Sequence, residues 1–411
     1  MAFAHQVGGH ANTILASPLS ASTLIKPSSP RELAFYQHLA PSLDPHLVGE
    51  WTPAFYGTLK LAGKLAPEGG VAPLDTPGDE PPADVEPEML VLENLTYRFV
   101  RPNVLDIKLG TQLFDEDAPP DKQERMRQAA RASTSAEAGV RLTGFQVWDA
   151  ATRAYVQTPK PFGRALAVDE LPLGVARFFY PPWSAPSRAE LAAAASPSSS
   201  AASPSSSSTA APTSTAPSTA PPPPPAPSPP APSPPAPAPA PLPLALLLPV
   251  LRTLVRRLDD LVHVWSALPL RMRGGSLLVV VEGDPDALEQ ALVRAQEDAA
   301  RAAAARRGRE GEGEGLGEEE GVGQDDDDDS DADSVSTATS NGTAAPHTLQ
   351  AFDVRVIDFA HTRALLAHES GPDEGVLKGL RTVRALVDEL VGRLRDEQRR
   401  EEGEGEGSAG K

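Results

Sequence analysis

The sequence predicts an α+β fold that is interrupted by two long insertions. Strand-like runs alternate with amphipathic helical stretches, a tract of Ser, Ala, Thr and Pro fills 184–243, and an acidic tract fills 308–346. Neither tract can bury enough apolar surface to offset the entropy of ordering its chain, so we expect both to be disordered. Strand-like runs flank each tract, which favours surface loops of one fold over a string of independent domains.

The negative charge is concentrated in one place. The net charge is −19, yet residues 310 to 333 hold thirteen acidic side chains and no basic one. The acidity of the whole chain therefore does not exclude an anionic substrate, because the local field governs a site. The absence of cysteine excludes disulfides and thiolate metal sites, and it fits a reducing compartment.

The apolar stretches of the chain show whether a secretory signal or a membrane-spanning segment is to be expected. The first ten residues, "MAFAHQVGGH", lack the charged start and the apolar run of a secretory signal. The most apolar stretch, "PLPLALLLPVLRTLVRRL", is too short before Arg252 to span a bilayer. We therefore expect a soluble intracellular protein.

The first hundred residues predict a small α+β unit. The runs "ANTILAS" and "STLIKP" are typical strands, and "MLVLENL" is typical of a buried strand. Between them, "SPRELAFYQHL" begins with a serine cap and continues at helical spacing. Residues 66 to 88 are rich in proline and acidic residues, which predicts a surface loop.

The remaining foldable sequence continues the same alternation. Before the first insertion it predicts a strand at "LDIKLG", a helix at "PPDKQERMRQAARAS", a strand at "VRLTGFQVWD" and a helix around "LPLGVARFF". After it come a helix over 244–268, a strand at "SLLVVVEG", a helix at "DALEQALVRAQEDAARAAAARRG" and a strand at "DVRVIDFAH". The last predicted helix carries one apolar stripe, which consists of Leu377, Leu380, Val383, Leu386, Val387 and Leu390.

Two acid-bearing strands carry the chemistry of interest. Because side chains alternate along a strand, Asp106 and Lys108 in "LDIKLG" lie on the same face. They form either a structural ion pair or part of a site for a charged ligand. With Asp358 in "VIDFAH", they provide what phosphoryl transfer requires: carboxylates for metal ions and a cation for the phosphoryl group. On spacing alone, an aspartate at a strand end is more often a turn or cap residue.

Around these residues the sequence resembles the inositol polyphosphate kinase family. The run "PNVLDIKLG" fits the family signature PxxxDxKxG. Further landmarks follow in the family's order: "HQVGGH", "LIKPSSPRELAFYQ", "LENLT", "GTQLFDEDAPPDKQERM", "STSAEAGVRLTGFQVW", "FGRAL", "GGSLLVVVEG" and "VRVIDFAHT". The pieces "HQVGGH", "PRELAFYQ" and "LFDEDAPPDKQERM" are most similar to fungal inositol polyphosphate multikinases.

The resemblance implies a two-lobed, protein-kinase-like fold with ATP between the lobes. It places the N-lobe, with its ATP-binding lysine and hinge, at 1–100. The C-lobe would consist of three pieces: 101–183 with the signature and the substrate helix, 244–307, and 347–397 with the metal-binding strand and the C-terminal helix. The insertions 184–243 and 308–346 and the tail 398–411 would be disordered.

The resemblance also implies roles at the nucleotide. Lys26 would reach the ATP phosphates, and the backbone of Glu93 and Leu95 would bind adenine at the hinge. Asp106 would lie by the ATP ribose. Asp358 would hold Mg²⁺, which prefers carboxylate oxygen and retains waters and phosphates as its other ligands. Ser276 would assist on the metal side.

The implied inositol phosphate site is basic. Lys108 would face the inositol phosphate and the transferring phosphoryl group, and His361 would approach the substrate phosphates. Lys122 and Arg125 share one helical face, so they are candidates for a basic wall, with a solvated surface as the alternative. Arg164 in "FGRAL" matches a family arginine. Gln146 stands where many relatives carry a basic residue, which leaves the substrate range open.

Three functions agree with the sequence to different degrees. The first is an ATP- and Mg²⁺-dependent kinase that converts inositol trisphosphate and tetrakisphosphate toward the pentakisphosphate. The second is a hexakisphosphate kinase that makes pyrophosphates. The third is a mainly non-catalytic nuclear interaction protein that works through its acidic tract. We expect a monomer in the nucleus and cytoplasm, without direct nucleic-acid binding or a membrane span. Protein partners would bind the acidic and proline-rich insertions.

Overall fold

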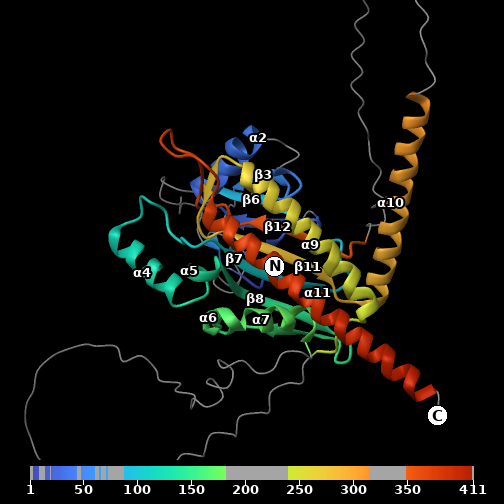
Figure 1. Ribbon diagram of the computed structural model, residues 1–411. Coiled ribbons are helices and arrows are strands. Elements are labelled where there is room, and N and C mark those ends of the chain that lie inside the picture. The colour runs from blue at the N-terminus through green and yellow to red at the C-terminus, as the bar shows by residue number, and fades with distance from the viewer. Residues whose placement is uncertain are drawn as a thin grey trace, which may run out of the picture.

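The computed structural model describes residues 3–8, 14–18, 20–43, 48–60, 64–65, 71–72, 88–181, 239–313 and 349–409. Most of the two predicted insertions, and most of the predicted loop over 66–88, lie outside these residues. Within them, a four-stranded sheet and a five-stranded sheet lie one after the other along the molecule, and long helices cover the larger sheet (Figure 1). This two-lobed arrangement of helices and sheets is the α+β fold that the sequence predicts.

The smaller sheet forms the N-lobe. Its antiparallel strands run in the order β1 (Leu15–Ala16), β2 (Thr23–Pro27), β6 (Glu88–Glu93) and β3 (Phe55–Lys60). The strands predicted at "STLIKP" and "MLVLENL" are confirmed as β2 and β6. Strand β3 has no clean apolar alternation, which explains why its sequence did not predict it.

The predicted loop over 66–88 needs one correction. Residues 71–72 form strand β5 (Val71–Ala72), which pairs with β4 (Lys64–Leu65) in an antiparallel ladder. The register places Val71 opposite Leu65 and Ala72 opposite Lys64.

The N-lobe helix begins as predicted and then widens. In α1 (Pro30–Ala34), the Ser29 side chain accepts a hydrogen bond of 3.2 Å from the Glu32 backbone. The helix continues as a π-helical turn, η1 (Phe35–Leu39), and a final short turn, α2 (Ala40–Ser42). The neighbouring side chains of Phe35 and Tyr36 are both buried in this wide turn.

The larger sheet forms the floor of the C-lobe. Its antiparallel order is β12 (Phe352–Ile357), β11 (Ser276–Glu282), β7 (Pro102–Leu109), β8 (Val140–Asp149) and β9 (Ala154–Thr158). The predicted signature strand is therefore central, as strand β7. Leu105, Ile107 and Leu109 are buried on one face, as their alternation predicts. A second small ladder pairs β10 (Leu270–Met272) with β13 (Thr362–Ala364).

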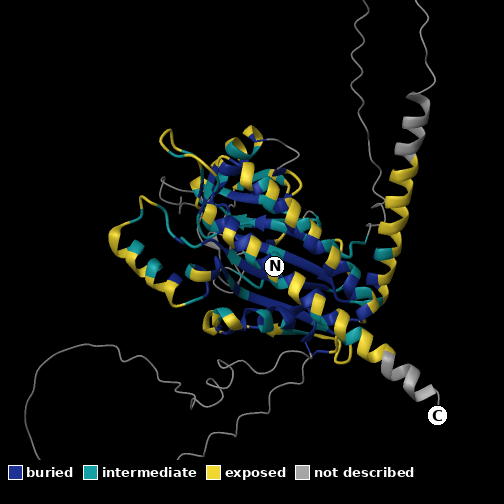
Figure 2. Cartoon of the chain, viewed as in Figure 1, coloured by how far each residue is buried: buried dark blue, intermediate teal, exposed yellow. Residues whose placement is uncertain are grey.

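Two long helices cover the C-lobe sheet. α9 (Leu244–Ala267) and α11 (Glu374–Ala409) lie side by side, with buried inner faces and exposed outer faces (Figure 2). The predicted stripe on α11 is confirmed, because five of its six residues are buried and Leu386 packs against the same core. The core runs without a break from Phe35 in the N-lobe to Leu394 in α11.

The shorter helices complete the C-lobe. They are α4 (Pro120–Arg131), α5 (Ser135–Ala138), α6 (Lys160–Ala165), the 3₁₀ turn η2 (Val168–Glu170) and α7 (Leu171–Phe179). Helix α10 (Pro285–Gly313) projects away from the body of the molecule (Figure 1). No helix of the described residues is both long and apolar enough to cross a membrane.

Two helices extend beyond the boundaries that the sequence predicts for ordered structure. Helix α10 continues to Gly313, past the predicted end of order at 307, and α11 continues to Ala409 through most of the predicted disordered tail 398–411. Once a long helix exists, each added residue costs no new nucleation step, so a helix can continue into segments that contain glycine, a poor helix former. Composition alone does not contain this effect of the preceding helix.

The first insertion leaves and re-enters the C-lobe at one place. Pro181 and Ala240 line the same small hollow beside Trp148 and Phe178. The Ala240 backbone N–H also donates to the Asp149 carboxylate at 3.2 Å. The chain ends that border 182–238 are thus held together by the folded part.

We predict that residues 184–238 can be replaced by a short Gly/Ser linker without loss of the fold. Shortening a loop between neighbouring ends changes the closure entropy by only about 1 kcal/mol, so Tm should shift by less than roughly 5 °C. Thermal unfolding followed by circular dichroism measures this. The matched control keeps the tract and carries Leu242→Asp, which places a charge at a buried position and should lower Tm. A linker variant that unfolds like the control would contradict the prediction.

Candidate active site

A cavity lies between the two lobes. Its volume is about 900 Å³ when it is counted out to its open mouth, and this falls within the range of small-molecule sites. Its walls come from the N-terminal segment 3–8, strands β2 and β6, the turn after β6, and strands β7, β11 and β12. Five residues that the sequence analysis assigned to the nucleotide line it, namely Lys26, Glu93, Leu95, Asp106 and Asp358.

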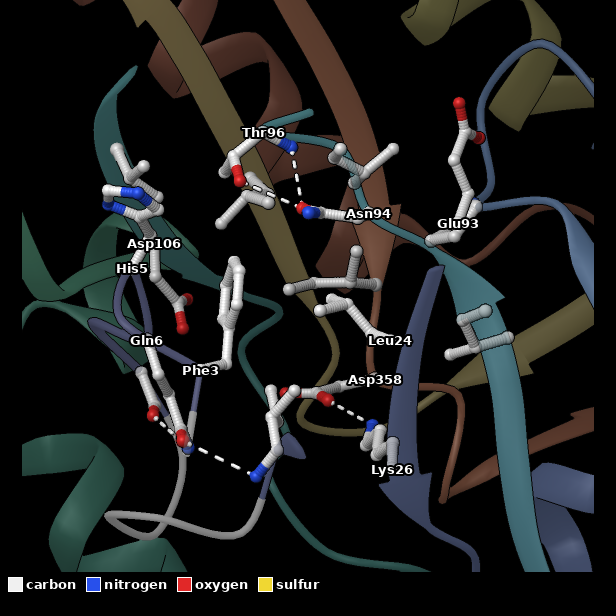
Figure 3. Close-up of a pocket in the computed structure, with 18 of the residues that line it drawn as sticks. Phe3, His5, Gln6, Leu24, Lys26, Glu93, Asn94, Thr96, Asp106 and Asp358 are labelled. Atoms are coloured by element: carbon white, nitrogen blue, oxygen red, sulfur yellow. Dashed lines mark hydrogen bonds and ion pairs between the residues drawn. The ribbon is translucent and has the colours of Figure 1, made fainter. Parts of the chain in front are cut away.

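A lysine between two carboxylates joins the lobes at this cavity. Lys26 of β2 lies 2.6 Å from Asp358 Oδ1 and 2.8 Å from Glu32 Oε1 of α1 (Figure 3 shows the first contact). Burial alone would lower the pKa of Lys26, but the charges of Asp358 and Glu32 outweigh it and raise the pKa. Lys26 is therefore a fixed positive charge at the cavity wall.

Asp358 is held in an unusual backbone conformation. Its φ is +66°, in the left-handed region that few residues other than glycine, asparagine and aspartate adopt. The next residue anchors this turn: the Phe359 N–H donates to Glu32 Oε1 at 3.3 Å, and its ring stacks on Phe35 at 3.9 Å. Burial opposes ionisation of Asp358, but Lys26 and Lys108 outweigh it and lower the pKa. Its side chain is thus an anion at the cavity.

Asp106 is a buried carboxyl group without full hydrogen bonding. It is only 3% exposed, and its Oδ1 has no hydrogen-bond partner within the described part of the chain. Burial and the like charge of Asp358 raise the pKa of Asp106 to about 6, although Lys108 acts in the opposite direction. A buried acid that is close to a second acid is poorly satisfied until a cation or a hydrogen-bond donor arrives.

This donor set fits a magnesium-type ion. Among the described residues there is no cluster of three or more His, Cys, Asp or Glu side chains, which excludes an all-protein metal cage there. Mg²⁺ does not need such a cage, since it binds through one or two carboxylates and keeps water and phosphate ligands. Asp358 and the unpartnered oxygen of Asp106 can supply those carboxylates.

Lys108 and Ser276 lie in one row across the C-lobe sheet. The register places Ser276 opposite Ile357 on one side and Lys108 on the other, and Lys108 opposite Arg141. The Lys108 ammonium donates to the Gly274 carbonyl and acts electrostatically on both aspartates. Ser276 is fully buried, its hydroxyl acts as a hydrogen-bond donor that lowers the pKa of Asp106, and it does not line the cavity. Its predicted metal role stays a prediction.

The hinge offers a backbone donor to a ligand. The Glu93 N–H donates to Ala54 O at 2.9 Å, so this amide is already used by the sheet. Asn94 holds the turn, because its Oδ1 accepts from the Thr96 backbone and hydroxyl at 3.1 and 2.8 Å. The Leu95 N–H has no hydrogen bond within the described residues. Of the two predicted adenine contacts, Leu95 is thus the one whose backbone N–H is still able to donate to a ligand.

His361 contacts an acidic segment that crosses between the lobes. Its Nδ1 lies 2.5 Å from Asp115 Oδ2, and the same oxygen lies 3.1 Å from the Arg31 guanidinium of α1. The neighbouring Glu116 lies 2.7 Å from Arg273 of the C-lobe. His361 is 44% exposed on its side chain, so its predicted approach to substrate phosphates requires Asp115 to give way.

The basic residues near the site form two separate groups, of which only the first was predicted as a basic wall. Lys122 and Arg125 lie on α4, and neither forms an ion pair within the described residues. A different group lies next to Asp106, and sequence reasoning missed two of its members: Lys160, whose charge lowers the pKa of Asp106, and half-buried Arg141. Burial and nearby Arg164 lower the pKa of Arg141.

These charges form a basic patch of Lys108, Arg141, Lys160 and Arg164 at the floor of the C-lobe. The strand alternation of "GVRLTG" and the pairing with "LDIKLG" would have pointed to Arg141, but Lys160 lies after an unpredicted strand.

Comparisons with known proteins show what the chain is similar to. The family model described as inositol polyphosphate kinase matches residues 89–195 and 247–388. The inositol polyphosphate multikinase of Schizosaccharomyces pombe is 28% identical over 185 residues, which cover 43% of this chain and 62% of that protein. The Saccharomyces cerevisiae multikinase is 32% identical over 163 residues, covering 35% and 45%. The chain thus spans less than two thirds of the length of either relative.

A solved structure shares the fold. The crystal structure of an inositol phosphate multikinase from S. cerevisiae, in complex with ADP and Mn²⁺, superposes with a TM-score of 0.51. The alignment covers 90% of this chain and 99% of that one at 19% identity. A two-lobed kinase-like fold with charged residues at the interlobe cavity defines the class. The chain belongs to the inositol polyphosphate kinase family.

We predict that Glu32→Gln weakens the fold far more than a matched surface change. Glu32 is 2% exposed and bonds both Lys26 and the Phe359 backbone, so the loss of its charge should cost about 1–3 kcal/mol in the free energy of unfolding. Glu50→Gln breaks a 2.6 Å pair with Arg257 at a half-exposed position and should cost less than about 1 kcal/mol. Urea unfolding compares them, and equal effects would contradict a buried role for Glu32.

We also predict that Asp106→Asn stabilises the nucleotide-free protein at neutral pH. Because folding raises the pKa of Asp106 from 3.8 to about 6, ionisation opposes folding, and this penalty grows between those values and is constant above them. The amide should add about 2 kcal/mol to the free energy of unfolding at pH 7.5 and less at pH 5, as measured in urea.

The matched control for Asp106 is Asp149→Asn. Hydrogen bonds from Thr152, together with backbone N–H groups, lower the pKa of Asp149, so its ionised form stabilises the fold above the ordinary pKa. Removal of that charge should destabilise the protein at pH 7.5, opposite in sign to Asp106→Asn. The interpretation of Asp106 fails if both variants lose stability at this pH.

Proposed function

We propose that this protein is an ATP-dependent kinase that phosphorylates hydroxyl groups of inositol phosphates. The observation that carries the proposal is the meeting of Lys26, Asp106 and Asp358 on one interlobe cavity, with Lys108 acting on both acids. The fold shared with a multikinase that was solved with ADP and Mn²⁺ supports a nucleotide and a divalent ion as its ligands.

The chain's own residues divide the work between nucleotide and substrate. The Leu95 N–H and the apolar walls formed by Leu24 and Leu92 would hold the adenine. Lys26 would lie against the phosphates, where Glu32 keeps its ammonium in place. Phosphoryl transfer depends mainly on positioning and on neutralising charge, so these fixed groups provide most of what the reaction needs.

Magnesium would be held by Asp358 with help from Asp106. When bound, the ion supplies charge neutralisation on the phosphate oxygens. Asp358 is suited to hold it, because Lys26 and Lys108 keep its pKa low and the left-handed turn fixes its direction.

The acceptor would be a highly charged inositol phosphate. Lys108, Arg141, Lys160 and Arg164 place a basic patch beside the nucleotide cavity, and such a patch suits a ring that carries several phosphates. We infer that inositol trisphosphate and tetrakisphosphate are the substrates and that the pentakisphosphate is the product, as the similarity to multikinases suggests. Residence in the nucleus and cytoplasm, and protein partners for the insertions, are further parts of this proposal.

We predict that Asp358→Asn abolishes turnover while the fold persists. Asparagine tolerates the left-handed backbone at this position, so the substitution removes the charge without straining the turn. Turnover should fall by about 10²-fold or more. The assay uses purified protein, labelled ATP, Mg²⁺ and inositol phosphates that carry three to six phosphates.

The control for this assay is Asp259→Asn, at an exposed position on α9 where Asp259 pairs with Arg384. It should retain wild-type turnover. Activity that survives Asp358→Asn would contradict the site. Turnover on the hexakisphosphate alone would instead identify a pyrophosphate-forming enzyme.

A further inference from the structure

The N-terminal segment 3–8 reaches out of the N-lobe and lies on the C-lobe sheet. Five of its six residues line the cavity: Phe3, His5, Gln6, Val7 and Gly8. Figure 3 shows His5 and Phe3 close to Asp106, on the side of the cavity opposite the hinge. The segment is therefore one wall of the proposed nucleotide site.

Two glycines let the segment approach this closely. A Cβ on Gly8 would overlap the Asp106 carboxylate, and a Cβ on Gly144 would lie 2.5 Å from the Val7 carbonyl. Gly144 is the register partner of Asp106 on β8. The backbone of the segment thus presses on the sheet at the position of the buried acid.

One side chain of the sheet holds the segment by hydrogen bonding. Gln146 of β8 is only 1% exposed, and its Nε2 lies 2.7 Å from His5 Nδ1 and 3.3 Å from the Pro102 carbonyl. An amide nitrogen donates two hydrogen bonds and accepts none, so both of its protons are used. The opposite amide orientation would turn the Gln146 oxygen toward the Pro102 carbonyl, where two acceptors would face each other.

The His5 ring is held in a defined state by this contact. Its Nδ1 must accept, so the neutral ring carries its proton on Nε2. Burial lowers the pKa of His5, which agrees with a neutral ring. The ring also packs edge-on against Tyr155 of β9 at 5.3 Å and against Phe3 at 5.7 Å. The imidazole thus fills a polar and aromatic socket on the C-lobe.

We propose that Gln146 is a positioning residue for the nucleotide site, which it closes by fixing His5 and, through it, the segment 3–8 over Asp106. The proposal rests on the proposed function in taking the ligand to be a nucleotide. It gives Gln146 a role other than that of the basic residue that many relatives carry at this position. A buried amide with both protons committed to His5 and Pro102 has no donor left for a phosphate.

The test measures ADP binding to the full-length protein by isothermal titration calorimetry in the presence of Mg²⁺. Gln146→Leu keeps the size of the side chain but removes both donors, so ADP should bind about three- to tenfold more weakly. His5→Phe keeps the ring contacts with Tyr155 and Phe3 but removes the acceptor, and it should weaken ADP binding to the same extent. This second variant lies outside the buried sheet, so it keeps the test valid if Gln146→Leu does not fold.

The matched control is Gln157→Leu, at the exposed register partner of Gln146 on β9. It should bind ADP like the wild type. The double variant of His5 and Gln146 should bind no more weakly than Gln146→Leu alone, because both changes remove the same hydrogen bond between His5 and Gln146. In turnover assays, KM for ATP should rise in both single variants, while KM for the inositol phosphate and kcat stay close to wild type.

Four outcomes would overturn the proposal. Unchanged ADP affinity in both single variants, or additive losses in the double variant, would show that the contact does not position the segment. A rise in KM for the inositol phosphate alone would place Gln146 in the substrate site instead. A wild-type protein that binds no ADP would overturn the proposed function as well, which separates that failure from the failure of Gln146 alone.

Discussion

The organisation of this site depends on one buried cation of the N-lobe that forms ion pairs with a carboxylate from each lobe. Lys26 comes from the N-lobe sheet, Glu32 from the helix behind it, and Asp358 from the end of a C-lobe strand 332 residues further along the chain. A lysine with two carboxylate partners compensates for its own desolvation, and it also fixes the directions of both acids. Because the Phe359 backbone bonds to Glu32 as well, the same contact aligns the turn that presents Asp358. Separating Lys26 from either carboxylate would leave a buried charge without its partner, and this free-energy cost keeps the cavity in its present form.

The C-lobe contributes charges that are less well compensated. Asp106 is buried, lacks a partner for one oxygen and lies near a second acid, so the nucleotide-free protein carries an unfavourable interaction at its centre. A ligand that brings a cation relieves that interaction, and the free energy released then contributes to binding. Asp106 therefore lowers the stability of the nucleotide-free protein and raises its affinity for a ligand that brings a cation. The basic patch around Lys108 extends the same principle, since its like charges repel each other until an anion arrives.

Much of this arrangement could be predicted from the sequence, for reasons that differ by element. Strand β7 and the stripe of α11 follow from strict apolar periodicity, and Asp106, Lys108 and Asp358 were found because their strands frame them with buried residues. Contacts that join distant segments have no such local pattern. The bond between His5 and Gln146, the pairing of His361 with Asp115, and the placement of Lys160 near Asp106 all depend on how segments distant in sequence pack together. The tail of α11 was missed because helix propagation depends on the preceding residues rather than on local composition.

The left-handed backbone at Asp358 limits the residues that can succeed it during evolution. Asn and Gly adopt this conformation readily, whereas Glu keeps the carboxylate but strains the turn. A descendant sequence can thus lose the charge in one step without disturbing the stack of Phe359 on Phe35. We expect inactive members of this lineage to have Asn or Gly at this position and to keep an intact lobe junction. Such proteins would retain the fold after losing the activity.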